Sequence, residues 1–273
     1  MADVILAVLG RPETAHAVLD AARCLGGLAG HASIVVLTID APPGPRPLAA
    51  EALMAEVGDV EDGRKREQRR IASLKTMFDA WADGARQDGN TVQWVEAAGA
   101  ESVVVEERGR RADTIVIAKP GPDDDAPVRH AFQAALFHTE RPVLVVPRRI
   151  TVPFGRRVAI SWRDDSRTMK AIIPALRVLA SAEQVHLLAG VRKDKTPPGI
   201  PAILTDRDIK ADLHILPIGA DPFGKTMLET LHALDCDMLV MGAYAHTPLR
   251  EMIFGGVTRY VFEHAGVPVL MRH

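Results

Sequence analysis

The residues best suited to chemistry are glycines that follow a short apolar run near the end of the sequence. Met238 to Met241 lead into Gly242, and Gly255-Gly256-Val257-Thr258 come where a loop should become a helix. Glycines at such turns let the backbone approach a ligand, and a helix N-terminus offers amides and partial positive charge to a phosphate. The pattern favours a phosphate-binding loop, although glycines that only close turns would produce the same spacing.

Three side chains near this loop have both a chemical and a structural interpretation. His246 lies within the loop and is suited to a phosphate or ribose contact, but an exposed loop histidine is the plainer interpretation. Trp162 and Tyr244 could stack on a base, and each fits equally well as a buried aromatic at the end of a strand. These residue types alone do not decide between the two.

Other reactive groups favour structural roles. The sequence has no Gly-x-Ser-x-Gly, His-Glu-x-x-His or Gly-Lys-Ser/Thr motif. The run Asp123 to Asp125 offers oxygen ligands for magnesium or calcium, but it lacks an EF-hand pattern, so we favour a solvated acidic loop. Cys24 and Cys236 lie far apart among apolar neighbours, and we expect two reduced structural thiols. We therefore predict no catalytic residue and no metal site.

The composition limits the classes of protein to which the chain can belong. Of its 273 residues, 47% are hydrophobic and 25% are charged, which rules out intrinsic disorder as the main state. A net charge of −2 and only 4% aromatic residues disfavour nucleic-acid binding. No apolar stretch reaches the roughly 18–20 residues that span a bilayer, and no basic region precedes the first apolar run. We expect a cytoplasmic protein without membrane or nucleic-acid partners.

Short apolar runs alternate with helical patterns along the chain. Helical spacing covers 13–28, 166–179 and 249–264, a short helix is expected near 201–209, and the charged residues 61–67 indicate a solvated helix face. Continuous apolar strands separated by helices are typical of parallel sheets in α/β folds. The predicted strands are 4–9, 33–39, 91–95, 114–117, 143–146, 157–162, 184–190, 211–218, 237–241 and 268–271.

Both halves of the chain end with the same pattern. Residues 112–118 resemble residues 236–242, and residues 138–144 resemble residues 264–270. Two matches in the same order indicate a duplication. We predict two tandem doubly wound α/β domains, residues 1–148 and 155–273, joined by a linker near residues 147–155.

The repeated pattern, with its closing run from Gly266 to Leu270, resembles the universal stress protein family over the whole chain. Nucleotide-binding members of that family carry a glycine, two residues, a second glycine, nine residues, a third glycine and then Ser or Thr. Gly242 and Gly255 fill the first and third positions, whereas Ala245 replaces the second glycine and Gly256 replaces the Ser or Thr.

The resemblance implies how each domain folds and where a ligand binds. It implies an open five-stranded parallel sheet in the order 3-2-1-4-5, of the adenine-nucleotide alpha-hydrolase-like type, with the two domains paired through their last strands. It also implies that ATP or a related adenine nucleotide, with Mg²⁺ where a triphosphate binds, occupies the second domain. The implied binding residues are Ser161, Gly190, Met241, Gly242, Ala245, His246, Gly255, Gly256, Val257 and Thr258.

The second domain departs from the family at the end of its first strand. Arg163 stands where the family usually has an acidic residue, and a guanidinium has no acceptor for a ribose hydroxyl. Asp164 or Asp165 could take over that contact. We favour Asp165 or Ser166 as the N-cap of the following helix instead.

The first domain departs further. Pro120 and Pro122 remove amide donors from its equivalent loop, and the run Asp123 to Asp125 would repel phosphate. Its first strand ends in Leu9-Gly10-Arg11-Pro12, with no acidic residue. We therefore expect no nucleotide in the first domain.

Three functions follow from these interpretations. The leading one is a regulatory stress-response module that binds an adenine nucleotide in its second domain and hydrolyses ATP at most slowly, because no general base or phosphate-directed lysine is apparent. The second is a scaffold or interaction protein in which both sites have decayed. The third, which we rank last, is an enzyme acting on a nucleotide or another small phosphate ester. The sequence leaves open whether two chains form a homodimer.

Overall fold

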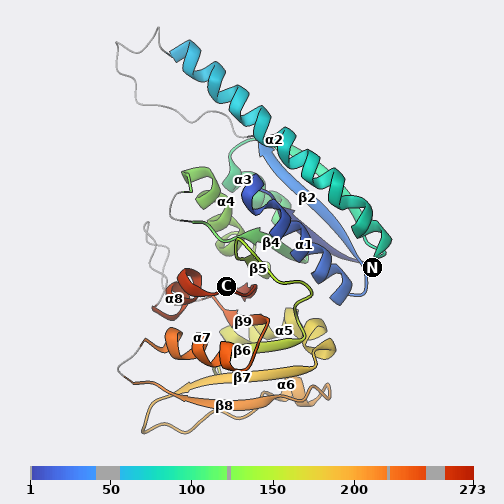
Figure 1. Ribbon diagram of the computed structural model, residues 1–273. Coiled ribbons are helices and arrows are strands. Elements are labelled where there is room, and N and C mark those ends of the chain that lie inside the picture. Colours follow the sequence, from blue (N-terminus) through green and yellow to red (C-terminus); the bar gives the residue numbers. More distant parts are fainter. Residues whose placement is uncertain (1, 41–55, 122–123, 220–221, 244–255) are drawn as a thin grey trace.

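One continuous sheet of ten strands organises the protein (Figure 1). The computed structural model describes residues 2–40, 56–121, 124–219, 222–243 and 256–273, without the side chains of residues 56–60. The strands are β1 (Asp3–Val8), β2 (Ala32–Asp40), β3 (Thr91–Ala98), β4 (Thr114–Ala118), β5 (Val143–Val146), β6 (Arg157–Trp162), β7 (Gln184–Val191), β8 (Asp212–Pro217), β9 (Met238–Gly242) and β10 (Val269–Arg272).

The strand order repeats the same topology twice. The sheet runs β3-β2-β1-β4-β5-β10-β9-β6-β7-β8, so each half has the order 3-2-1-4-5 within its own five strands. All pairs within a half are parallel. This confirms the α/β fold that the alternating pattern and the family resemblance predicted.

The two halves meet where their last strands pair. β5 and β10 are antiparallel, with Val145 opposite Val269 and Leu144 opposite Leu270. Nearby, Lys119 Nζ donates a hydrogen bond of 3.3 Å to the carbonyl oxygen of Glu263. The predicted pairing through the last strands is therefore present. The exact domain boundaries, 1–148 and 155–273, stay a prediction.

Helices cover both faces of the sheet (Figure 1). The side chains of four helices pack into one core cluster, and those of the other four pack into a second cluster on the opposite face. The first set is α1 (Pro12–Leu28), α2 (Glu56–Gln87), α5 (Ser166–Ser181) and α6 (Ala202–Thr205). The second set is α3 (Glu101–Gly109), α4 (Ala126–Phe137), α7 (Phe223–Ala233) and α8 (Gly256–His264).

The apolar runs are explained by burial on both faces. Along β1, Ile5 and Ala7 belong to one core cluster, while Leu6 and Val8 belong to the other. Since successive strand residues point to opposite faces, a strand covered on both sides must be apolar at every position. This is why the central strands read as continuous apolar runs.

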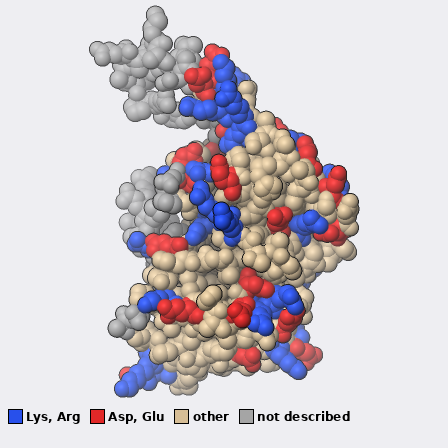
Figure 2. Space-filling view, in the orientation of Figure 1, with Lys and Arg blue, Asp and Glu red and all other residues tan. Residues whose placement is uncertain are grey.

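The two halves differ most in their second crossover. α2 has 32 residues and projects beyond the sheet, whereas its counterpart α6 has four (Figure 1). Figure 2 shows both signs of charge mixed over the visible face, including the projecting end of α2. This matches the small net charge of −2. In the part of the chain that the structure describes, no helix has the length and hydropathy needed to cross a membrane.

Candidate functional site

The predicted site lies where the strand order of the second half reverses. In open α/β sheets, ligands bind beyond the carboxyl ends of the strands at this switch point. In the second half, it falls between β6 and β9, which are neighbours in the sheet. β6 ends at Trp162, β9 ends at Gly242, and the chain after β9 leads to α8, which starts at Gly256.

Gly242 has a packing role in this arrangement. A Cβ added to this buried residue would lie 3.1 Å from the carbonyl oxygen of Arg167 and 3.4 Å from the amide nitrogen of Thr168. The next residue, Ala243, donates its amide to the carbonyl oxygen of Arg272 at 2.9 Å. The glycine thus lets the end of β9 lie directly against the first turn of α5.

The N-terminus of α8 has an exposed first residue and a buried hydroxyl two residues later. Gly256 is exposed, and a Cβ added to it would meet no atom within 4 Å. Val257 is partly buried. Thr258 is 1% exposed, and its Oγ1 has no hydrogen-bond partner among the described residues. The first turn of the helix contains no acidic residue.

Six predicted positions remain to be placed, and they do not all converge. Ala245, His246 and Gly255 lie outside the described residues, as does Tyr244. Ser161, on β6, is partly buried. A Cβ on Gly190 would lie 2.7 Å from the ring of Phe223, which accounts for this glycine by packing. Met241 is fully buried in the core, so only its backbone is available to a ligand.

The residues at the end of β6 and just after it have structural roles. Trp162 is buried in the core, and its Nε1 donates a hydrogen bond of 2.9 Å to the carbonyl oxygen of Gly199. Asp165 caps α5, where its Oδ1 accepts hydrogen bonds from the amides of Arg167 at 3.1 Å and Thr168 at 2.9 Å. Arg163 Nε lies 3.8 Å from Asp165 Oδ2. The predicted cap at Asp165 is confirmed, and Trp162 has no face open for base stacking.

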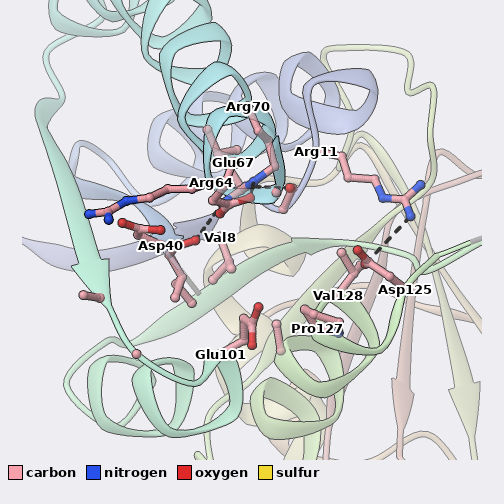
Figure 3. Close-up of a pocket in the computed structure, with 17 residues that line it drawn as sticks. Val8, Arg11, Asp40, Arg64, Glu67, Arg70, Glu101, Asp125, Pro127 and Val128 are labelled. Carbon is pink, nitrogen blue, oxygen red and sulfur yellow. Dashed lines mark hydrogen bonds and ion pairs between the residues drawn. The ribbon is translucent and has the colours of Figure 1, made fainter. Parts of the chain in front are cut away.

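The first half contains a cavity that was not predicted from the sequence (Figure 3). It has a volume of about 760 Å³ and lies beyond the carboxyl ends of β1, β2 and β3, beside α2 and the N-termini of α3 and α4. The charged residues that line it are Arg11, Asp40, Arg64, Glu67, Arg70, Glu101 and Asp125.

Arg70 connects three elements at the rim of this cavity. Its Nη1 donates to the carbonyl oxygen of Gly10 at 2.7 Å, and its Nη2 donates to that of Ile39 at 2.7 Å. Its Nε and Nη2 also donate to the carboxylate of Glu67, at 2.9 and 2.5 Å. The charged run 61–67, predicted to be a solvated helix face, therefore ends in a residue that turns inward and pairs with Arg70.

The acidic loop before α4 also differs from the prediction. Asp124 is 9% exposed; it forms an ion pair with Arg11 and accepts a hydrogen bond from the amide of Gly121 at 2.7 Å. Asp125 Oδ1 lies 3.9 Å from Arg11 Nη2. A solvated acidic loop was therefore wrong for Asp124, because Arg11 neutralises it where the chain enters α4.

The two thiols are buried or partly buried, and their surroundings keep them protonated. Cys236 is buried, and its burial, with the nearby Asp237, raises the pKa of its thiol to about 12. Burial likewise raises the pKa of Cys24. Both thiols are unpaired and protonated at neutral pH, as predicted for structural cysteines. Within the described residues, no three His, Cys, Asp or Glu side chains are grouped to hold a metal ion.

Comparisons with known proteins identify the class of fold. The family model described as the universal stress protein family matches residues 176–273. A universal stress protein from Archaeoglobus fulgidus DSM 4304 is 14% identical, with a TM-score of 0.69, over 100% of this chain and 98% of that chain. A functionally unknown protein from Pseudomonas aeruginosa PAO1 is 14% identical, with a TM-score of 0.61, over 99% of this chain and 92% of that chain.

These matches support two statements. The whole chain has the fold of a solved universal stress protein. Residues 176–273, which include β9 and α8, match the model of the universal stress protein family. A universal stress protein solved in complex with cAMP matches 54% of the chain with a TM-score of 0.33, too low to transfer its ligand. No curated protein matches the sequence.

Proposed function

We propose that the protein is a two-domain regulatory module, with domains 1–148 and 155–273, that binds ATP or a related adenine nucleotide in its second domain without efficient catalysis. The nucleotide would lie beyond the carboxyl ends of β6 and β9, with Mg²⁺ accompanying a triphosphate. The observation that carries this proposal is the first turn of α8, where the buried Thr258 hydroxyl lacks a hydrogen-bond partner among the described residues and Gly256 is exposed.

The chemistry of this helix start suits a phosphate. The first amides of a helix have no intrahelical acceptors, and the helix dipole adds partial positive charge there. No acidic residue in the first turn of α8 opposes an anion. A buried hydroxyl without a hydrogen bond is unfavourable, and a phosphate oxygen would satisfy it. The family-model match over this segment supports the same assignment.

The equivalent position in the first half is less suited to a nucleotide. Asp125 is the residue that precedes α4, and Asp124 lies beside it. Although Arg11 pairs with Asp124, a carboxylate at the start of α4 already occupies the favourable position for negative charge. This contrast supports placing the nucleotide in the second domain only.

The test compares two substitutions at α8 with matched controls. Calorimetric titration with ATP, AMP and cyclic AMP should detect binding to the native chain, and mass spectrometry of the purified protein should identify any retained nucleotide. Gly256→Asp should weaken binding at least about tenfold, the factor that corresponds to ~1.4 kcal/mol. The new side chain has room, and Gly256→Ala and Gly266→Asp control for size and for charge elsewhere, since both positions are open.

Thr258→Val tests the hydroxyl directly. It should weaken nucleotide binding several-fold, in keeping with the loss of about 1 kcal/mol from one hydrogen bond, without lowering the stability of the free protein. No retained nucleotide and no heat at millimolar ligand would contradict the proposal and favour an interaction protein with two decayed sites. Multiple turnovers of a nucleotide, abolished by Gly256→Asp, would indicate an enzyme instead.

A further inference from the structure

We propose that the cavity of the first half binds a small organic cation, namely an amine with an apolar body. This site is separate from the nucleotide site proposed for the second half, and neither depends on the other. Its volume of about 760 Å³ falls in the range of pockets that take small molecules, roughly 300–1,000 Å³.

The floor and one wall of the cavity are apolar. Val8 and Leu9, at the end of β1, and Ile39, near the end of β2, line it, and each is at most 5% exposed. Val128 and Ala131 line it from α4. Because Val8, Leu9 and Ile39 are already buried, the partly exposed Pro127 and Val128 provide the surface that an apolar ligand body covers with a gain in free energy.

Two of the three cations at the cavity are already neutralised. Arg70 uses Nε, Nη1 and Nη2 in hydrogen bonds to Glu67 and to two backbone carbonyls. Arg11 forms its ion pair with Asp124. Arg64 is exposed on α2 and makes no ion pair with any described residue. Among the described residues that line the cavity, only Arg64 is therefore left to attract an anion.

The carboxylates outnumber the available cation. Asp40, Glu101 and Asp125 reach the cavity from β2, α3 and the start of α4 (Figure 3). Among the described residues, neither Asp40 nor Glu101 has a side-chain hydrogen bond or an ion pair, and Asp125 is 3.9 Å from the already paired Arg11. The described lining therefore has four carboxylates and three guanidiniums, a balance of −1, which favours a monocation over a polyphosphate.

An organic cation fits better than a metal ion. The described acidic groups are not arranged to coordinate a metal. Figure 3 shows Glu101 directed from α3 into the cavity, across from the side chains of Arg70 and Glu67. An ammonium group near Glu101 would form a charge-assisted hydrogen bond, while its apolar body covers Ile39 and Val128.

The test uses three probes that share one body and differ in their polar end: 2-phenylethylamine, 3-phenylpropanoate and 2-phenylethanol. Titration calorimetry of the native chain should show binding of the amine and at least about tenfold weaker binding of the other two. Glu101→Gln and Asp40→Asn should each weaken amine binding, by about tenfold for a charge-assisted hydrogen bond. Glu107→Gln, which removes an exposed carboxylate from the same helix, should have no effect.

Several outcomes would overturn the inference: no amine binding up to the solubility limit, equal binding of the carboxylate probe, or equal effects of Glu101→Gln and Glu107→Gln. Circular dichroism establishes that each variant is folded. Amine binding should be unchanged in Gly256→Asp, because that residue lies in the other half. A failed nucleotide test and a failed amine test are therefore distinguishable.

Discussion

Two aspartates at equivalent positions of the repeat, Asp113 and Asp237, bind the backbone at the start of the first strand of each half. Asp113 Oδ2 accepts a hydrogen bond of 2.8 Å from the amide of Val4. Asp237 accepts one of 2.8 Å from Gly155 and one of 3.1 Å from Arg156. The sequence similarity of residues 112–118 and 236–242 thus reflects a shared contact as well as a shared strand.

Another residue-scale feature is a buried histidine that the duplication does not repeat. His186 Nδ1 lies 3.1 Å from His214 Nε2, and His186 Nε2 is buried with no hydrogen-bond partner in the described part of the chain. Burial is the main cause that lowers the pKa of His186; the nearby His214 and Arg157 lower it further, whereas Asp212 raises it. The folded protein therefore holds this imidazole in its neutral form.

The free energy of unfolding should fall when the pH drops below about 6.5, the ordinary pKa of histidine in an unfolded chain. Below that value the unfolded chain binds a proton that the folded His186 resists, so protonation favours unfolding. Urea unfolding of the native chain and of His186→Leu at pH 7.5 and 5.5 measures this. His186→Leu should lose less stability on acidification, whereas the exposed His232→Gln should lose as much as the native chain. Equal losses in all three would contradict the assignment.

At the scale of elements, Arg70 explains how a projecting helix is attached to the sheet. It joins α2 to the carbonyl oxygens of Gly10, after β1, and Ile39, in β2. Packing of Leu74 and Phe78 into the core fixes the following turns. The guanidinium thus marks the point at which α2 leaves the sheet.

Arg70→Met should destabilise the protein by about 1–3 kcal/mol, because two backbone carbonyls and Glu67 lose their donor. Arg70→Lys should restore only part of that loss, since an ammonium group cannot reproduce the planar fork. Urea denaturation followed by circular dichroism measures both. Arg69→Met, at the exposed neighbouring position, should stay within about 0.5 kcal/mol of the native chain. A similar loss of stability in both methionine variants would contradict the role of Arg70 in attaching α2 to the sheet.

Some helices and strands could be predicted accurately from the sequence and others could not, and the difference has physical causes. Doubly buried strands such as Val143–Val146 were predicted with their exact ends, because every position is apolar. α3 was not predicted: its run Val103 to Val105 is β-branched, which favours strands, and Val103 is 63% exposed. α7 was also missed. The first-half cavity could not be predicted, because it depends on how α2 places Glu67 and Arg70 over distant strands.

At the scale of the whole molecule, the two halves share one sheet, and each of the two core clusters contains residues from both halves. The first core cluster includes Ile5 and Leu19 from the first half and Ile160 and Leu179 from the second. Gly155, in the connection between the halves, has its Cα so close to Leu28 and Val178 that an added Cβ would lie 2.9 and 3.2 Å from their side chains. The family resemblance predicted that the last strands pair. It did not predict that the connection between the two halves packs against α1 and α5.

We expect the two halves to unfold in one cooperative transition. Trp81 and Trp94 report on the first half, and Trp162 reports on the second. Two variants separate these signals: the single substitution Trp162→Phe, and the double substitution Trp81→Phe and Trp94→Phe. Within each variant, the urea midpoint measured by fluorescence should coincide with the midpoint measured by circular dichroism. A two-step circular dichroism curve, of which fluorescence follows only one step, would show that the halves unfold independently.

Because β5 and β10 belong to one chain, their pairing does not depend on protein concentration, and the pockets of the two halves can differ. Between separate chains, such a pairing would depend on protein concentration; within one polypeptide its local concentration is set by the connection from β5 to β6 and survives any dilution. A symmetric pair of identical chains must also carry two identical pockets. In a single fused chain, each pocket can change without altering the other. The two halves differ in this way: carboxylates line the cavity of the first half, whereas the first turn of α8 in the second half has no acidic residue.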